Sequence, residues 1–153
     1  MRSAPVAAAL ALLVAVPITQ ATAQSNRGPD DPTIVAIFDA ANTVDIETGQ
    51  LASERGSTEQ IRQFGLMLMR DHQAVRQQGR DLAAKLRVTP TPPADTSAAH
   101  NHHMAMRRLR GLSGVAFDRA FLEHEIAFHK AVIDAVTTTL LPAIDNAEVK
   151  ALV

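Results

Sequence analysis

The sequence predicts an all-α fold, an antiparallel bundle of three or four helices. Apolar residues recur at alternating steps of three and four along most of the chain, which places them on one side of a helix. No segment shows the alternation of polar and apolar residues that is typical of a half-buried strand. Short polar segments separate the periodic stretches, so consecutive helices are expected to run antiparallel.

The N-terminal segment is not expected to be part of this bundle. Arg2 is followed by the apolar run "APVAAALALLVAVPI" and then by "ATA", which together predict a signal peptide over residues 1–23 that is cut after Ala23. Residues 24–31 are a polar lead, and the helical domain spans residues 32–153 with a linker at 88–95. No later apolar run has the roughly 20 residues of a membrane helix. The mature chain is therefore expected in the periplasm or as a secreted protein.

The first helix is predicted to begin with Asp31 as N-cap and Pro32 in its first turn, and to end at Gly56. Its apolar stripe includes the charged residue Asp45 and leaves Glu47 on the opposite side. The stripe comprises Ile34, Ile37, Phe38, Ala41, Val44, Asp45, Thr48, Leu51 and Ala52.

The second helix shows the most regular pattern, with His72 on its apolar stripe. Ser57 and Gln60 have the spacing of a capping box, and "TPTPP" ends the helix after about Arg87. Glycines inside a helix cost about 1 kcal/mol each relative to alanine. Those at positions 49, 65 and 79 therefore predict close approach of neighbouring backbones.

The remaining helices are predicted over residues 95–111 and from Ser113 to near Pro142. Two broad faces of the long helix are apolar, which predicts a central position in the bundle. Asp145 and Glu148 are spaced like another capping pair, but few residues follow them. The bundle is thus expected to be incomplete at its C-terminus, with a groove that a second copy or an envelope partner would close.

Composition excludes several classes of function. The chain has no cysteine, so disulfides, thiolate ligands and catalytic thiols are excluded. With Arg2 removed, 14 basic side chains face 16 acidic ones, and no segment concentrates positive charge as a nucleic-acid-binding surface would. Neither a Ser-His-Asp order, a glycine-rich phosphate loop nor an HExxH motif is present, so a hydrolase or nucleotide-binding function has no support.

Three stretches together carry a family resemblance: "DIETGQLASE", "FGLMLMRDH" and "LSGVAFDRAF", the last followed by a histidine. Over residues 32–153 the chain resembles an exported bacterial family classed as domain of unknown function 4142 and often labelled as outer membrane proteins. The resemblance implies a ferritin-like helical bundle and no established reaction. The chain differs from the family at two places. His124 is not a usual family residue, and the family continues past this C-terminus through a further helix that carries another histidine. The positions that match recurrent polar sites of the family are Asp45 (usually Glu), Asp71, His72, Asp118, Glu125 (more often Gln or Met) and His129.

These residues lead to two interpretations of the bundle interior. A buried imidazole requires partners for its nitrogen atoms, so His72 either joins a hydrogen-bond network or ligates a metal. In the first hypothesis a divalent transition metal (Fe, Mn, Zn or Cu) binds to the interior histidines and carboxylates. The Glu-x-x-His motif of di-iron sites is missing, which favours a binding or protective protein over an oxidative enzyme. In the second hypothesis, the polar groups only fix the helix register of a metal-free structural or interaction module of the cell envelope, with a stress-related role.

A second candidate site is the segment "HNHHMAM". Imidazole and thioether groups are ligands for copper, and imidazole also suits nickel. A histidine-rich polar surface with an inward methionine explains the segment equally well. The candidate ligands are His100, His102, His103, Met104 and Met106.

Overall fold

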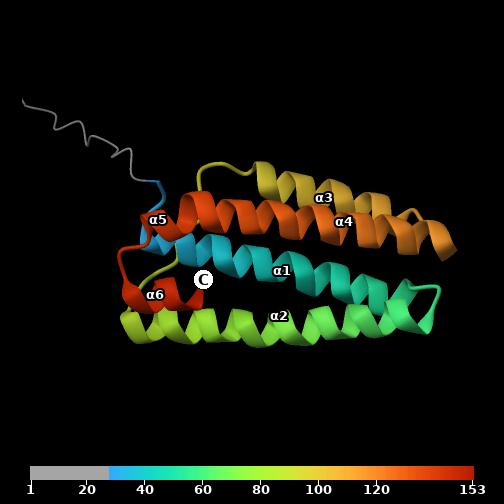
Figure 1. The fold of residues 1–153 in the computed structure, drawn as a ribbon, viewed down its shortest axis with the longest axis horizontal. Helices are drawn as coiled ribbons and strands as arrows, with labels where there is room; N and C mark the ends of the chain where they lie inside the picture. Colours follow the sequence, from blue (N-terminus) through green and yellow to red (C-terminus); the bar gives the residue numbers. More distant parts are fainter. Residues whose placement is uncertain (1–27) are drawn as a thin grey trace, which may run out of the picture.

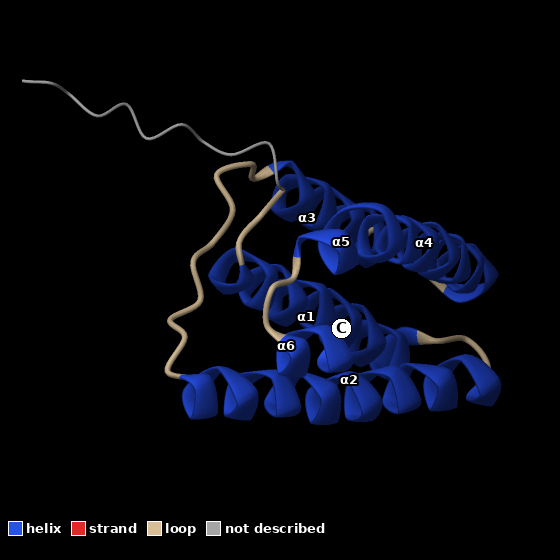
Figure 2. Cartoon of the chain, turned by 60° about the vertical axis from the view of Figure 1, so that its left-hand side comes forward, coloured by secondary structure: helices blue, strands red, loops and turns tan. Residues whose placement is uncertain are grey.

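The computed structural model describes residues 28–153, and every regular element in that range is helical, which confirms the predicted all-α bundle (Figure 2). The expected signal peptide, residues 1–23, lies outside the described residues, as do residues 24–27 of the polar lead. None of the described helices combines the length and the apolar character needed to cross a membrane. The elements are α1 (Asp31–Arg55), α2 (Glu59–Leu86), α3 (Ser97–Arg110), α4 (Gly114–Ala135), the π-helical turn η1 (Val136–Leu140), α5 (Leu141–Ala143) and α6 (Ala147–Leu152).

Helices α1 and α2 form a close antiparallel pair, and two facing glycines allow the close approach. A Cβ atom on Gly65 would lie 2.5 Å from the carbonyl oxygen of Gly49, and one on Gly49 would lie 2.7 Å from that of Gly65. The predicted close approach is therefore confirmed at these two positions. At Gly79 the space is filled by the ring of Phe38, 2.8 Å from the place of a Cβ atom. Side chains of α1 and α2 thus meet in a fixed register.

The central helix of the bundle is α1, which contacts α2, α3 and α4 (Figure 1). The central position predicted for α4 is wrong. Two of its faces are apolar, but only one is buried, because Val115, Leu122, Ile126 and Ile133 on the second face are exposed. Helix α4 is therefore an outer helix with an apolar outer face.

Two apolar clusters stabilise the bundle, and a polar band separates them along α1. Asn42, Asp45 and Thr48 of α1 are all buried between the clusters, and Glu125 of α4 is buried with them. Burying polar groups is unfavourable unless they are paired. Apolar packing therefore does not explain why polar residues occupy this band of the interior. The clusters comprise Leu51, Ala52, Leu68, Met106, Leu109, Phe117, Ala120 and Phe121 on one side, and Ile34, Val35, Ala83, Leu140, Ile144 and Val149 on the other.

The two ends of the chain's helical region are joined by capping interactions. The N-cap of α1 is Asp30, whose carboxylate accepts a hydrogen bond of 3.0 Å from the backbone N–H of Thr33, and not the predicted Asp31. Asp31 instead accepts from the backbone N–H groups of Asp145 and Asn146, at 3.1 and 3.0 Å. Asn146, rather than the predicted Asp145, caps α6. The start of α1 therefore fixes the segment that leads into α6.

The α1–α2 connection also differs from the prediction by one residue. The N-cap of α2 is Thr58, whose hydroxyl accepts from the backbone N–H of Ile61 at 3.3 Å, while the predicted cap, Ser57, bonds to α4. Gly56 is the C-cap of α1 as predicted. The long helix predicted to reach Pro142 is α-helical only to Ala135 and then continues as η1 and α5.

Candidate metal centre

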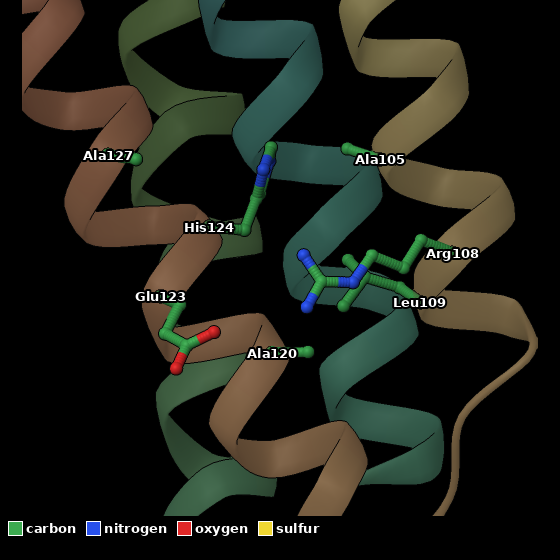
Figure 3. Close-up of a pocket in the computed structure, with 7 residues that line it drawn as sticks. All are labelled: Ala105, Arg108, Leu109, Ala120, Glu123, His124 and Ala127. Carbon is green, nitrogen blue, oxygen red and sulfur yellow. The ribbon is translucent and has the colours of Figure 1, made fainter.

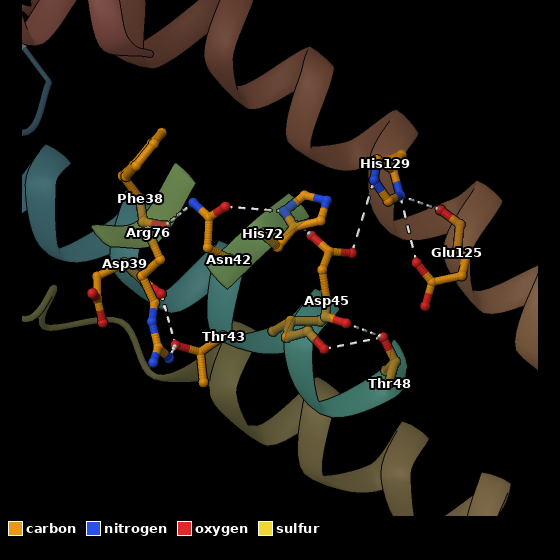
Figure 4. A network of polar contacts seen from close by, with 11 residues as sticks. Phe38, Asp39, Asn42, Thr43, Asp45, Thr48, His72, Arg76, Glu125 and His129 are labelled. Carbon is orange, nitrogen blue, oxygen red and sulfur yellow. Dashed lines mark hydrogen bonds and ion pairs between the residues drawn. The ribbon is translucent and has the colours of Figure 1, made fainter. Parts of the chain in front are cut away.

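Three side chains from three helices converge in the polar band (Figure 4). Asp45 comes from α1, His72 from α2 and His129 from α4, and one ligand atom of each lies within 4.8 Å of those of the other two. The centroids of the two imidazole rings are 6.0 Å apart. The predicted convergence of the two histidines with an acidic group is confirmed. Among residues 28–153 this interior triad is the one group of three or more His, Cys, Asp or Glu side chains with such spacing.

Asp45 is the buried member of the triad, with 3% of its surface exposed. Its Oδ2 atom lies 3.3 Å from Nδ1 of His72, and its Oδ1 atom lies 3.8 Å from Nε2 of His129. The Oδ1 atom is buried without a hydrogen-bond partner. Burial, followed by the negative charge of Glu125, raises the pKa of Asp45 from 3.8 to about 7. The ionised carboxylate of Asp45 therefore has no positively charged group close enough to compensate for its burial.

The ring of His72 is oriented by Asn42. The side-chain amide of Asn42 donates to the backbone carbonyl of Phe38 at 2.8 Å, so its Oδ1 atom is turned toward Nδ1 of His72, 3.0 Å away. Nδ1 then carries the proton and donates it to Asn42, which leaves the lone pair of Nε2 free. Burial, and then the charge of His129, lower the pKa of His72, so the neutral form that a metal requires is favoured.

The ring of His129 is oriented in the same manner by the backbone of its own helix. Its Nδ1 atom lies 2.9 Å from the carbonyl oxygen of Glu125 and donates to it. The proton is thereby placed on Nδ1, and the free Nε2 faces Asp45 (Figure 4). A backbone carbonyl bonded to one ring nitrogen is the usual device that fixes a metal-ligating histidine. Both imidazoles therefore direct an unprotonated Nε2 away from their orienting partner.

Glu125 adds a second carboxylate beside the triad. It is 4% exposed, and neither of its carboxylate oxygens has a hydrogen-bond partner. Its Oε2 atom lies 3.7 Å from Nδ1 of His129. The nearby hydroxyl of Thr48 donates instead to the backbone carbonyl of Val44 at 3.0 Å. Burial raises the pKa of Glu125, as it does for Asp45. The two buried carboxyl groups lie close enough to affect each other's pKa, and a proton on Asp45 would be donated to Glu125. Without that proton or a cation, the oxygens of both groups are unpaired.

This arrangement fits a divalent transition metal. Around a four-coordinate ion with bonds of about 2.0–2.2 Å, ligand atoms lie about 3.3–3.6 Å apart. The Asp45 and His129 atoms are 3.8 Å apart, close to this separation, and the His129 side chain is the most exposed of the three, at 41%. Two imidazoles and a carboxylate suit Fe, Mn, Zn or Cu and leave coordination positions open to water.

Two predicted ligands lie elsewhere. Asp71 is exposed and forms a 2.8 Å ion pair with Arg70, because one residue along a helix turns the side chain by about 100° away from the direction of His72. Asp118 is buried but accepts hydrogen bonds from the backbone N–H of Ser57, at 2.9 Å, and from its hydroxyl. Its role is to attach the α1–α2 connection to α4. Neither residue belongs to the interior triad.

The predicted soft-metal cluster on α3 is dispersed over the helix surface. His100, His103 and Met104 are exposed, whereas Met106 is packed in the apolar core at 4% exposed. His102 points inward, and its Nε2 atom lies 2.9 Å from a carboxylate oxygen of Glu47 on α1. The five side chains therefore do not converge on one point.

Two polar residues near the site were not predicted from the sequence. Asn42 stands three residues before Asp45 on the same face of α1, and this spacing is the signal that could have identified it as the partner of His72. His124 lies between α3 and α4, beside a small hollow that is also lined by Ala105 and Arg108 (Figure 3). Its Nε2 atom is buried without a hydrogen-bond partner, and burial lowers its pKa.

Comparison with known proteins gives a family match over most of the chain. A family model described as "Domain of unknown function (DUF4142)" matches residues 16–153. No curated protein and no solved structure matches the chain.

Proposed function

The chain belongs to the family described as Domain of unknown function (DUF4142), and from the geometry of its interior triad we propose that it binds one divalent transition-metal ion. Asp45, His72 and His129 supply the ligand atoms, and Glu125 is the fourth candidate ligand. The observation that carries the proposal is the meeting of these three groups from three helices within 4.8 Å. Fe, Mn, Zn and Cu are the metals that suit this set of donors.

A satisfied hydrogen-bond network is the competing explanation, and the unpaired oxygens weigh against it. Oδ1 of Asp45 and both carboxylate oxygens of Glu125 are buried without a hydrogen-bond partner. Leaving a buried acceptor unsatisfied costs about 1–3 kcal/mol, and more for a charged group. A cation held by Asp45, His72 and His129 would give the buried Oδ1 atom of Asp45 the partner that it lacks. The oriented rings of His72 and His129 are therefore better explained as ligands than as a register device.

The missing Glu-x-x-His motif of di-iron sites favours a role in binding, sequestering or protecting a metal over oxidative catalysis. We also propose that the protein acts in the periplasm or as a secreted protein, because residues 1–23 have the charged start, apolar middle and small-residue exit of a signal peptide. Mass spectrometry of the protein from a cell with an intact export system is expected to show a chain that begins at Gln24. A chain that retains residues 1–23 would contradict this localisation.

Metal binding is tested by melting curves of chelator-treated protein with and without Mn²⁺, Fe²⁺, Zn²⁺ or Cu²⁺. At one hundred times the dissociation constant a metal stabilises the fold by about 2.7 kcal/mol, which raises the Tm of a domain of this size by about 10 °C. The His72→Gln/His129→Gln variant is expected to lose this rise. The matched control is His100→Gln/His103→Gln, which removes the same number of imidazoles from the exposed side of α3.

Each outcome separates the hypotheses. A Tm that no metal raises and EDTA does not lower supports the metal-free structural or interaction module and contradicts the proposal. A rise with copper or nickel that is lost in the His100→Gln/His103→Gln variant assigns binding to the α3 histidines. Elemental analysis of protein purified without chelator gives an independent measurement, since less than about a tenth of an equivalent of metal would contradict a resident ion.

A further inference from the structure

An apolar stripe runs along the outer face of α4. Val115, Leu122, Ile126 and Ile133 are 74%, 38%, 58% and 61% exposed. Their spacings of seven, four and seven residues bring all of them to within about 20° of one straight line on the helix. Helix α3 lies beside α4 (Figure 2), and Val115, at the start of the stripe, lines a shallow hollow together with Arg108 and Leu112. Scattered exposed apolar residues are ordinary, but a straight line of them about 27 Å long indicates an interaction surface.

The spacing of this stripe is symmetric about position 124. Val115 and Ile133 are each nine residues from that position, and Leu122 and Ile126 are each two residues from it. In an antiparallel pair of such helices with a twofold axis level with residue 124, Val115 of one copy meets Ile133 of the other. Leu122 likewise meets Ile126. A twofold interface requires this reciprocal pattern, whereas a surface for an unrelated helix does not.

We propose that α4 pairs antiparallel with α4 of a second copy of this chain and that the protein is a homodimer. From their exposed fractions the four side chains present roughly 350–400 Å² of apolar surface per copy, the size of a functional patch. Twofold homodimer interfaces are about 65% apolar. Two stripes therefore match a total buried area of about 1,200 Å², at the lower end of stable interfaces. The expected dissociation constant is in the micromolar range.

Charged residues flank the stripe on one side and give the dimer a characteristic salt dependence. Arg119 and Lys130 lie about 40–60° from the line of the stripe. Antiparallel pairing brings Arg119 of one copy to within one residue of the level of Lys130 of the other. Glu123, four residues after Arg119, only partly offsets this repulsion. Because salt screens like charges, the dimer is expected to become tighter from about 50 to about 500 mM salt. A contact driven by charge attraction would become weaker.

The stripe also borders the interior triad. His129 stands three residues after Ile126 and four before Ile133, and 41% of its side chain is exposed. A second copy on the stripe would cover the exposed side of this ring. The dimer does not depend on the proposed metal, so the measurements that test it are all made in EDTA.

The first test is sedimentation equilibrium between about 1 and 200 μM. The unaltered chain is expected to change from monomer to dimer across this range. Ile126→Glu places two like charges close to the twofold axis and is expected to weaken the dimer at least thirtyfold. Met67→Glu is the matched control, because Met67 is 42% exposed on α2 and away from the stripe. Circular dichroism of both variants checks that they are folded.

The second test is cross-linking, which is specific because the chain has no cysteine of its own. A mixture of Val115→Cys and Ile133→Cys chains is expected to form a disulfide-linked dimer under mild oxidation. Either variant alone is expected to stay unlinked, because its two thiols are about 27 Å apart in the antiparallel pair. Disulfides require Cα atoms less than about 7 Å apart.

Three results would overturn the proposal. The first is a monomer at the highest concentration, which would leave the stripe to a different partner. The second is a dimer that Met67→Glu weakens and Ile126→Glu does not. The third is efficient cross-linking of Val115→Cys with itself, which would indicate a parallel pair.

Discussion

Replacing Asp45 by asparagine is expected to stabilise the metal-free protein at pH 8, although the residue lies at the centre of the proposed site. Its pKa is raised to about 7 in the fold by burial and by Glu125, whereas in the unfolded chain an aspartate titrates near 3.9. Between about pH 4 and 7 the folded state therefore binds a proton that the unfolded state has released. The stability of the metal-free protein consequently falls as the pH rises through this window.

The magnitude follows from the size of the pKa difference. About three pKa units correspond to at most about 4 kcal/mol. Water that reaches the partly exposed rings of His72 and His129 screens the charge, so the expected effect is about 1–3 kcal/mol. An asparagine side chain resembles the protonated carboxyl group in shape and carries no charge at any pH. Asp45→Asn should thus gain about 1–3 kcal/mol at pH 8 and almost nothing near pH 4.

The assay is urea unfolding in EDTA, followed by circular dichroism at several pH values from 4 to 8. His72 titrates in both chains, so the difference between the two stability profiles reports the Asp45 carboxyl group together with its coupling to Glu125. Asp71→Asn is the matched control, because a hydrogen bond from Arg70 lowers the pKa of this exposed carboxylate. A variant at position 45 that is less stable than the unaltered chain at pH 8, or equally affected at pH 4 and 8, would refute the reasoning.

Three further outcomes follow from other contacts. Gly65→Ala is expected to lower the free energy of unfolding by about 1–3 kcal/mol, because its Cβ atom would lie 2.5 Å from the carbonyl oxygen of Gly49. Gly111→Ala, where the nearest atom is 3.4 Å away, should be close to neutral; urea unfolding of both variants checks this contrast. Phe117→Ala is expected to lose about 3–5 kcal/mol, since the ring is fully buried, and a smaller loss by the same measurement would contradict its place in the core. Metal affinity is expected to fall below pH 7, because a proton with a pKa of about 7 on Asp45 must leave; equal affinities at pH 5.5 and 8 in competition titrations would exclude Asp45 as a ligand.

The helices and the interior triad could be predicted from the sequence because both depend on periodicity. Asp45, His72 and His129 stand on the apolar stripes of their helices, and side chains on facing stripes must meet inside a bundle. Periodicity does not resolve neighbouring cap residues, however. Asp30 and Asp31 are equally competent to cap α1, and the choice depends on the contact of Asp31 with the segment before α6.

The errors have physical causes as well. An apolar face on α4 indicates that water is unfavourable there, but it does not say whether the same chain or another one covers it. The sequence pattern therefore predicted α4 at the centre, whereas Ile126 and Ile133 are exposed. Asp71 was predicted as a ligand because it stands next to His72 in the sequence "RDH". Adjacency in a motif does not indicate the direction in which each side chain points. The rotation between adjacent helical residues separates the two.

A metal at the interior triad would link α1, α2 and α4 within the polar band. The apolar clusters hold these helices together only on either side of that band. Helices α1 and α2 are already fixed to each other by Gly49 and Gly65, so His72 and Asp45 form a stationary half of the site. His129 belongs to α4, whose contact with α2 includes Phe64 and Phe121 in the apolar cluster away from the polar band. The ligand that must move to close the site is therefore His129, the most exposed of the three. Metal binding should accordingly order α4 around residue 129 more than it orders α1 or α2, and amide hydrogen exchange with and without metal would show whether protection increases there first.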